Sequence, residues 1–500
     1  MSSGWILAID QGTTNTKALL VGRDGQPVFR TSVPLIIQAP HPGWVEQDAV
    51  ALWQSVLNAV QTCLSWAAQN DGRVEGVSIS NQRETVVAWR RSDGRPVTPA
   101  ILWQCRRSGP LCDKLRADGR EPMLRELTGL GIDPLFSASK MQWLLENLPG
   151  LRDQAAAGDI CFGTVDSWLI WMLTQGATHA CDVSNASRTQ LLNLRTAGWD
   201  PELLALFGIP SVALPKVQSS SCVFGLCSGI DGLQDTPIVS AMGDSHAAAA
   251  GHACFAPGTV KATCGTGSSL MSLLPRLPNL QANSRLATTI AWRIAGDPVQ
   301  YALEGNISMS GAAVQWVGEF LGLPNPIDDA VALAASVTDS NGVYFVPAMV
   351  GLGAPHWDSE ARGNISGLNR TSRAPHLALA AVESIAFQIA DVFHAMAQEA
   401  GDLPTLHTDG GAARNDWLMQ FQADVLERPV IRSDHEDLSA LGAAWLGGLS
   451  LGWWHSLADL DDVAIQTTTF QPGPLSRTRS ARYSEWQLAV LRARLREVQP

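Results

Sequence analysis

Trp5-Ile-Leu-Ala-Ile-Asp-Gln-Gly-Thr-Thr14 is a short apolar run that ends in an acidic residue and a Gly-Thr turn. A second apolar run follows at residues 17–21, and Arg23-Asp-Gly25 supplies turn residues before a third run at 27–33. Apolar runs of this length, separated by turn residues, are typical of β-strands joined by hairpins. The beginning of the chain therefore predicts an antiparallel meander.

The same strand-and-turn plan returns further along the chain. It predicts strands at residues 76–80, 237–242, 259–264, 269–274 and 405–408, and helices at 141–147, 376–400 and 415–427. Glycine-containing turns, Gly265-Thr-Gly267 and Asp409-Gly-Gly411, follow two of these strands. We interpret the chain as an α/β protein with a boundary between residues 246 and 256, giving domains 1–250 and 251–500.

Length and composition agree with two globular domains. A chain of 500 residues exceeds the roughly 250–300 residues at which single cores stop growing. A net charge of −12 without a basic cluster argues against nucleic acid or an anionic membrane as a partner.

The start of the chain lacks a basic signal-peptide region. Residues 440–454 are too few to span a bilayer, and they predict a buried helix of small residues. Nine cysteines match neither a zinc site nor a disulfide framework, so we expect a reduced, cytoplasmic protein.

Three Gly-Thr or Gly-Gly turns, near Thr13, Thr266 and Gly411, each follow an apolar strand. The chain contains no Gly-Lys dipeptide and no G-x-G-x-x-G, which excludes a P-loop and a dinucleotide fingerprint. Such turns can direct backbone N–H groups at phosphate oxygens, and Asp10 at a strand end could hold magnesium through water. Each turn alone is typical of an ordinary connection, but three at corresponding places favour a nucleotide site.

Asp244 lies where a predicted strand becomes a helix. A carboxylate there suits a general base that accepts a hydroxyl proton in phosphoryl transfer, or it caps the helix. The segment Gly243-Asp-Ser-His-Ala247 also approaches the G-x-S-x-G elbow of a serine esterase, with Ser245 as nucleophile and a histidine such as His407 as partner. These interpretations stay open at the level of the residues.

Arg83 and Glu84 follow the strand at 76–80, and Trp103 lies about twenty residues later. An arginine and a glutamate at a strand end can bind vicinal hydroxyls, and an aromatic ring can pack on the C–H face of a polyol. A solvated turn pair is the alternative.

Seven ordered motifs resemble the FGGY carbohydrate kinases, and within that family the glycerol kinases, over residues 5–455. They are Ile9-Asp-Gln-Gly-Thr-Thr14, Asn81-Gln-Arg-Glu-Thr85, Trp103-Gln-Cys-Arg-Arg107, Phe162-Gly-Thr-Val-Asp166, Asn185-Ala-Ser-Arg-Thr189, Gly265-Thr-Gly267 and Asp409-Gly-Gly411.

The resemblance implies two actin-like, hexokinase-type (ribonuclease H-like) ATPase domains with ATP in the cleft between them. It implies Asp244 as the catalytic base and Asp10 as the magnesium residue. The implied nucleotide-binding residues are Thr13, Thr14, Lys17, Thr266, Gly311, Gln315, Gly411 and Asn415. The implied substrate-binding residues are Arg83, Glu84, Trp103, Leu135, Asp244, Ser245 and Ser269.

Several of these positions depart from the glycerol kinase pattern. Leu135 replaces a Tyr, Ser245 a Gln and Ser269 a Phe, and Lys17 stands where an Arg is usual, which keeps the charge without the bidentate fork. The resemblance therefore implies a wider, more hydroxyl-rich pocket. The family's Gly-Gly-x-Arg effector loop is absent at residues 229–235, so we expect no inhibition by fructose bisphosphate.

The sequence thus predicts an ATP- and Mg²⁺-dependent kinase of a primary hydroxyl, with a polyol or ketose longer than glycerol as substrate. A true glycerol kinase, the serine esterase and a non-catalytic sugar sensor are the alternatives. We expect a small-molecule polyol or sugar as the partner, and the sequence leaves a homodimer or homotetramer open.

Overall fold

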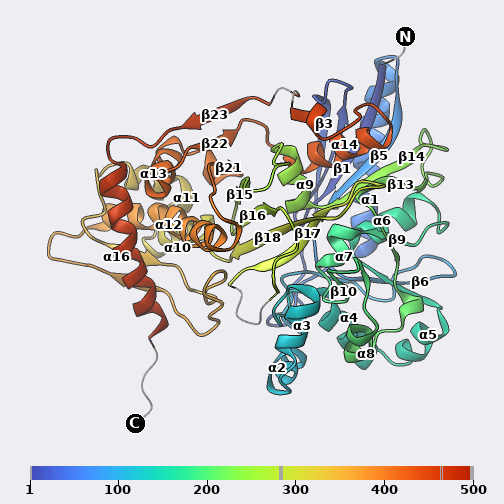
Figure 1. Cartoon of the computed structure of the whole chain (residues 1–500), viewed down its shortest axis with the longest axis horizontal. Helices are drawn as coiled ribbons and strands as arrows, with labels where there is room; N and C mark the ends of the chain where they lie inside the picture. Colours follow the sequence, from blue (N-terminus) through green and yellow to red (C-terminus); the bar gives the residue numbers. More distant parts are fainter. Residues whose placement is uncertain (1–2, 281–284, 462, 464, 496–500) are drawn as a thin grey trace. The chain divides into compact units, whose positions relative to one another are not determined.

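A computed structural model describes residues 3–280, 285–461, 463 and 465–495 (Figure 1). By its internal contacts the chain divides into two compact units. Unit 1 comprises Met1–Phe255, Leu274–Ala302 and Asp437–Ala464, and unit 2 comprises Ala256–Leu273, Leu303–Glu436 and Ile465–Pro500. Each unit is thus made of three separate segments of the chain, whereas the predicted ranges place a single boundary after residue 250. The domain ranges 1–250 and 251–500 stay a prediction.

Unit 1 is built on a mixed sheet in the order β13-β14-β5-β1-β2-β3. Its strands are β1 (Ser3–Gln11), β2 (Asn15–Val21), β3 (Pro27–Pro34), β5 (Gly72–Asn81), β13 (Ser221–Leu226) and β14 (Pro237–Gly243). Strands β1, β2 and β3 form the predicted antiparallel meander, while β5 runs parallel to both β1 and β14. The carboxyl ends of β1, β5 and β14 therefore lie side by side, where Asn81 pairs with both Gln11 and Gly243.

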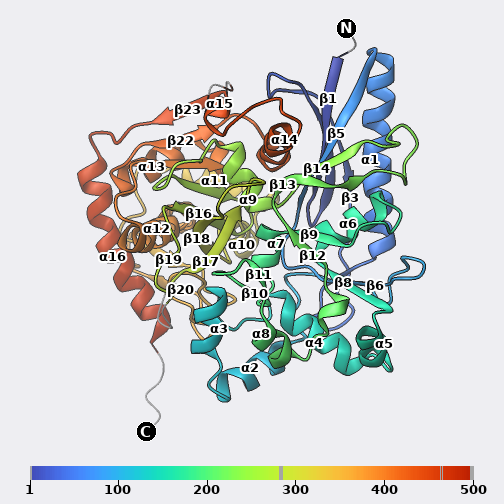
Figure 2. The same ribbon diagram turned by 45° about the vertical axis from the view of Figure 1, so that its right-hand side comes forward.

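Helices cover both faces of this sheet. In Figure 2, α1 (Ala49–Gln69) lies along one side of β1 and β5, and α14 (Leu438–Ser450) lies on the other side. Asp48 caps α1 by accepting from two backbone N–H groups, and the buried face of α1 joins the main core cluster of unit 1. The helix at 438–450 is the buried small-residue helix that the sequence predicted, although it ends before residue 454.

Glycines let α14 approach α9 (Asp244–Gly251) at backbone distance. A Cβ at Gly442 would lie 1.9 Å from the Ala247 carbonyl oxygen, and one at Gly251 would lie 2.2 Å from that of Leu438. Any larger side chain would push the two helices apart. This contact fixes α9, whose first residue is Asp244.

The other elements of unit 1 are β4 (Glu46–Gln47), β6 (Val87–Arg90), β7 (Ala100–Ile101), α2 (Gly109–Ala117), α3 (Glu121–Thr128), α4 (Ser137–Asn147), α5 (Leu151–Ala157), β8 (Ile160–Gly163), α6 (Val165–Leu173), β9 (Ala180–Asp182), α7 (Val183–Ser187), β10 (Leu192–Asn193), β11 (Gly198–Trp199), α8 (Pro201–Phe207), β12 (Lys216–Gln218), β17 (Ala287–Trp292) and α15 (Ala458–Asp461). Many belong to a second core cluster that α4 and α5 share with β8 and α8.

Unit 2 repeats the strand plan of unit 1. Its sheet contains, in order, β18 (Gln300–Ile307), β16 (Ser268–Leu274), β15 (Val260–Cys264), β21 (Leu406–Asp409), β22 (Val430–Ser433) and β23 (Thr467–Phe470). Strand β15 pairs antiparallel with β16 and parallel with β21, so the carboxyl ends of β15 and β21 meet at one edge. The predicted strands at 259–264, 269–274 and 405–408 are confirmed.

The helices of unit 2 are α10 (Gly311–Phe320), α11 (Pro326–Ala334), α12 (Ala374–Ala400), α13 (Asp416–Leu426) and α16 (Ser476–Arg494), and a separate hairpin joins β19 (Tyr344–Val346) to β20 (Asn364–Ser366). Figure 1 shows α16, in red, beside α13. Among the described residues α12 alone is long and apolar enough to cross a membrane, and most of that apolar stretch is buried inside the unit, as in a core helix. All nine cysteines are free thiols.

Candidate active site

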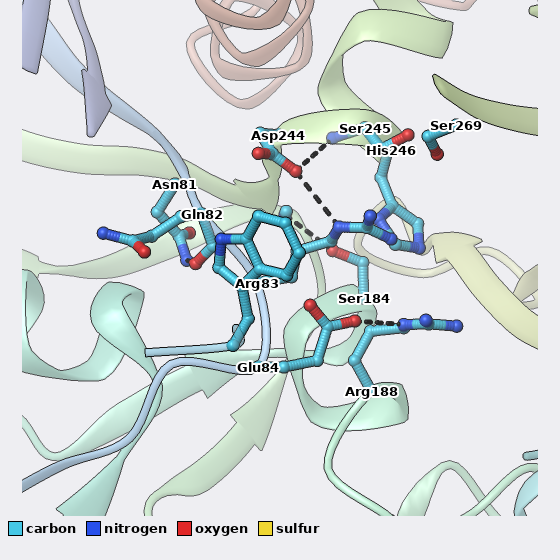
Figure 3. Close-up of polar contacts among 12 residues, drawn as sticks. Asn81, Gln82, Arg83, Glu84, Ser184, Arg188, Asp244, Ser245, His246 and Ser269 are labelled. Atoms are coloured by element: carbon cyan, nitrogen blue, oxygen red, sulfur yellow. Dashed lines mark hydrogen bonds and ion pairs between the residues drawn. The ribbon is translucent and has the colours of Figure 1, made fainter. Parts of the chain in front are cut away.

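The carboxyl ends of β14 and β5 bring Asp244 and Arg83 together (Figure 3). The Arg83 Nε donates to Asp244 Oδ1 at 3.0 Å, and the Ser245 backbone N–H donates to the same oxygen at 2.6 Å. Gly243 makes the first contact feasible, because a Cβ there would lie 2.7 Å from the Arg83 side chain. Asp244 Oδ2 makes no hydrogen bond to the described residues, and 40% of the Asp244 side chain is exposed. One oxygen of this carboxylate is thus fixed while the other is available to a ligand.

Asp10 lies at the end of β1, beside this group. The Ser80 hydroxyl donates to its Oδ1 at 2.9 Å. Burial raises the pKa of Asp10 to about 6; the charge of Lys17 works against that rise, while the charge of Asp244 adds to it. Two carboxylates that influence each other in this way are close in space. The structure therefore brings together two of the acidic residues that the sequence singled out, within unit 1.

Lys17 lies opposite Asp10 in the β1–β2 register. Its ammonium group donates to Asp437 at 2.9 Å. Burial lowers the pKa of Lys17, but the carboxylates of Asp437 and Asp10 more than offset this, so the pKa is raised above its usual value. Lys17 is a permanent cation at this edge, and its predicted contact with a nucleotide stays a prediction.

The turn between β1 and β2 connects to the predicted substrate side. The Trp103 indole N–H donates to the Thr13 hydroxyl at 3.0 Å, and the Gln47 amide donates to the Thr13 carbonyl at 2.6 Å. Thr14 is exposed. Trp103 and the first Gly-Thr turn, far apart in sequence, are therefore neighbours in unit 1.

Hydrogen bonds from neighbouring side chains and to them fix the backbones of Glu84 and Leu135. Glu84 has a positive φ of 60°, and the Ser137 hydroxyl donates to its carbonyl at 3.1 Å. The Leu135 N–H donates to Asp133 Oδ1, and the Lys140 ammonium donates to the Leu135 carbonyl. Leu135 is half-buried and packs against a small apolar cluster. The backbone at both positions is fixed by contacts within unit 1.

In unit 2, the turn after β15 rests on the start of α10. The backbone N–H groups of residues 310 and 312 donate to the Thr266 carbonyl, and the Gly311 N–H donates to the Gly265 carbonyl. A Cβ at Gly311 would lie 2.7 Å from the Gly265 oxygen, and one at Gly410 would lie 2.5 Å from the Cys264 oxygen. The Gly-Thr-Gly turn is thus flanked on two sides by glycines that no other residue can replace without displacing backbone.

The remaining predicted residues of unit 2 lie nearby or on its helices. Gln315 donates to Glu319 one turn further along α10, and Asn415 caps α13 by accepting from the Leu418 N–H. Gly411 has ordinary helical dihedral angles and open space around it. The Ser269 hydroxyl donates to Glu304 at 3.3 Å. Gln315, Gly411 and Asn415 belong to a candidate phosphate-binding edge, since ligands of open α/β sheets bind beyond the carboxyl ends of the strands. The role of Ser269 in substrate binding stays a prediction.

Sequence reasoning missed the residues that support these positions. Gln47, which donates to the Thr13 carbonyl, belongs to none of the motifs found in the sequence. Ser184 accepts from the Gly243 N–H, and Asn185 exchanges two side-chain hydrogen bonds with Asn81. The motif at 185–189 is visible in the sequence, but its structural role is not, because its partners are distant along the chain.

Asp166 and Asp182 are fully buried and interact electrostatically, so they form a buried carboxylate pair. Burial, and then the charge of Asp182, raises the pKa of Asp166 to about 7, and burial also raises the pKa of Asp182. Asp182 accepts from Ser184 and Asn185, the residues that contact β14 and β5. The pair therefore holds residues that contact the strand ends of the site, and it carries a proton near neutral pH.

Asp166→Asn is expected to flatten the dependence of stability on pH. Because the folded state keeps the Asp166 proton up to about pH 7 while an ordinary aspartate loses it near 3.8, unfolding releases a proton between these values and wild-type stability falls as pH rises. The fall should amount to about 3 kcal/mol between pH 5 and 8. Melting temperatures across that range measure it, with exposed Asp153→Asn as a control that follows the wild type. An Asp166→Asn protein with the wild-type pH slope would contradict the expectation.

Residues 5–251 match the FGGY family of carbohydrate kinases, N-terminal domain, and residues 260–451 match its C-terminal domain. An apulose kinase of Pectobacterium atrosepticum is 46% identical over 98% of both chains. A glycerol kinase of Symbiobacterium thermophilum is 47% identical over 99% of both chains. The crystal structure of Plasmodium falciparum glycerol kinase with ADP matches with a TM-score of 0.92 at 30% identity, over 99% of each chain. The predicted two-domain α/β fold is thereby confirmed.

Proposed function

The chain belongs to the FGGY family of carbohydrate kinases and is an ATP-dependent phosphotransferase for a sugar or polyol, and we propose that its acceptor is the primary hydroxyl of a polyol or ketose longer than glycerol. Membership removes the serine esterase interpretation. The observation that carries the proposed site is the carboxylate of Asp244, fixed through Oδ1 and open at Oδ2, at the strand ends beside Arg83 and Asp10.

Asp244 acts as the general base in this proposal. Its free oxygen accepts the proton of the substrate hydroxyl as that hydroxyl oxygen forms a bond to the terminal phosphorus of ATP and the bond to the bridging oxygen breaks, so that ADP leaves. Arg83 keeps the carboxylate oriented. Glu84 accepts and Arg83 donates hydrogen bonds to substrate hydroxyls, and Trp103 packs on the C–H face. Thr13, Thr14 and Lys17 from unit 1, and Thr266, Gly311, Gln315, Gly411 and Asn415 from unit 2, are the proposed nucleotide residues. Little covalent chemistry is required of the protein, so positioning and charge neutralisation provide the rate.

Magnesium is proposed to use Asp10. One of its oxygens accepts from Ser80 and the other makes no hydrogen bond to the described residues, which suits an oxygen ligand of Mg²⁺. The described residues hold no group of three or more metal-ligating side chains, which fits an ion held by one carboxylate, water and phosphate oxygens. Bound there, the ion would neutralise phosphate charge.

The substrate class rests on the residues that depart from the glycerol kinase pattern. Leu135 offers no hydroxyl, and its half-buried side chain is held by a fixed backbone. Ser245 and Ser269 are small where the pattern has larger side chains. The apulose kinase and the glycerol kinase relatives are nearly equal in identity, so overall similarity does not choose between a ketose and glycerol. The replaced side chains favour a larger acceptor than glycerol.

A substrate panel tests the proposal directly. We expect kcat/KM to be highest for a pentitol or pentulose and at least tenfold lower for glycerol, because each unfilled contact in a pocket costs about 1–3 kcal/mol. Coupled ADP detection across glycerol, tetritols, pentitols and pentuloses measures it. Glycerol ranking first would identify a true glycerol kinase, and binding without ADP formation would revive the sugar-sensor alternative.

The cellular location, partners and oligomeric state of the enzyme are also part of the proposal. An acidic chain that acts on small metabolites with ATP, and whose cysteines are all free, suits the cytoplasm, with neither nucleic acid nor a membrane as partner. A homodimer or homotetramer remains part of the proposal.

A further inference from the structure

We propose that Arg188 is a positioning residue that holds the Glu84 carboxylate as a fixed hydroxyl acceptor and so sets the affinity for the carbohydrate. The inference rests on the proposed role of Glu84 in substrate binding. Arg188 belongs to the motif at 185–189 and has no role in the proposed chemistry.

The Arg188–Glu84 ion pair is almost completely buried. The Arg188 Nε donates to Glu84 Oε1 at 2.7 Å, with 1% of the arginine side chain and 5% of the glutamate side chain exposed; Figure 3 draws this contact as a dashed line. A buried carboxylate without a cationic or hydrogen-bonded partner is strongly unfavourable. Arg188 therefore makes it feasible to keep a charged acceptor at this depth.

Only one oxygen of Glu84 is used by the pair. Oε2 makes no hydrogen bond to the described residues, so it is the oxygen available to a substrate hydroxyl. The backbone of Glu84 is fixed separately, by its left-handed φ of 60° and by the Ser137 hydroxyl on its carbonyl. With the backbone and Oε1 both held, the direction of Oε2 is determined before any substrate arrives. Preorganisation of this kind lowers the entropy lost on binding.

Arg188 is itself fixed from two sides. It follows α7 directly, and the N-terminus of α7 is capped by Asp182, which accepts from two of its N–H groups. The Asn185 side chain on α7 is hydrogen-bonded to Asn81 at the end of β5. The guanidinium carbon lies 5.2 Å from the centre of the Phe136 ring, which restricts the plane of the guanidinium group.

Lys140, a second cation that interacts with Glu84, cannot take over this role. It interacts electrostatically with Glu84, but its ammonium group donates to the carbonyls of Leu135 and Phe136. Its site disfavours the charged form, since burial lowers the pKa of Lys140 to about 8. A cation already committed to two carbonyls provides charge near Glu84 without directing its oxygens.

Arg188→Gln separates positioning from general stability. Carbohydrate binding is measured by isothermal titration calorimetry with glycerol and with D-xylulose, which requires no turnover. We expect at least tenfold weaker binding of the better of the two probes, at least tenfold higher carbohydrate KM, and kcat and the KM for ATP within threefold of wild type. Arg188→Lys should recover part of the loss. Arg107→Gln removes another buried ion pair, with Glu46, and should lower the melting temperature without weakening carbohydrate binding.

The double variant Glu84→Gln/Arg188→Gln identifies the route of the effect. If Arg188 acts through Glu84, the double variant binds no more weakly than Glu84→Gln alone. Three results would overturn the inference. They are a double variant whose loss of carbohydrate affinity equals the product of the two single losses, unchanged binding in Arg188→Gln, or a lower kcat at constant KM. A wild type that binds a probe but phosphorylates no carbohydrate would end the proposed function while this inference stands, and one that binds neither probe would end both.

Discussion

Asp244→Asn is expected to lower kcat about 1,000-fold while leaving ATP affinity within threefold of wild type. The asparagine keeps the shape of the side chain and the oxygen that accepts from Arg83 and Ser245, so the site should stay assembled. It removes the basic oxygen that takes the hydroxyl proton, and a positioned general base contributes about 10²–10⁴ in rate. Coupled ADP detection gives kcat, and calorimetry with ATP gives the affinity.

Ser245→Ala is the matched control for this experiment. Ser245 is adjacent to the base and only 6% exposed. Its replacement by alanine removes one hydroxyl group and little volume, so the packing around Asp244 should be kept. The variant should keep most of kcat. An Asp244→Asn protein with more than a tenth of wild-type activity, or a Ser245→Ala protein that loses as much as Asp244→Asn, would contradict the assignment of the base.

Gly410→Ala is expected to destabilise unit 2 by about 3 kcal/mol, which lowers the melting temperature by roughly 3–8 °C, depending on whether unit 2 unfolds with the whole chain or alone. Gly410 has a φ of 93°, where a side chain is strained, and its Cβ would lie 2.5 Å from the Cys264 carbonyl oxygen. The contacted atoms are backbone, so relief requires β15 and β21 to separate just where the Gly-Thr-Gly turn begins. Differential scanning calorimetry measures the change.

Gly411→Ala is the neighbouring control with the opposite expectation for stability. Gly411 has a φ of −60°, and a Cβ added to it would have no other atom within 4 Å, so the melting temperature of the variant should match that of the wild type. Because its open side is where we propose the nucleotide, the methyl group should raise the KM for ATP several-fold. Equal melting temperatures for the two variants would contradict the strain argument, and an unchanged KM for ATP in Gly411→Ala would contradict the proposed nucleotide contact.

Much of the fold was predictable because its signals are local. Apolar runs with turn residues between them predicted the strands β1, β2, β14, β15 and β21 to within a few residues. Helix α12 was also predicted to within two residues, since its apolar side chains recur at helical spacing. The discontinuous units were not predicted, because which segments pack together depends on contacts between residues hundreds of positions apart.

The candidate site likewise has features that the sequence predicts and features that only the tertiary structure shows. Residue types at strand ends identified Asp10, Arg83 and Asp244, because the chemistry of acids and bases is carried by the side chain itself. The sequence alone also determined the family and hence the reaction class. The tertiary structure decided which oxygen of Asp244 is open, that Trp103 contacts Thr13, and that Arg188 holds Glu84. These are distances and directions between side chains remote in sequence, and packing of the whole unit sets them, so no local pattern encodes them.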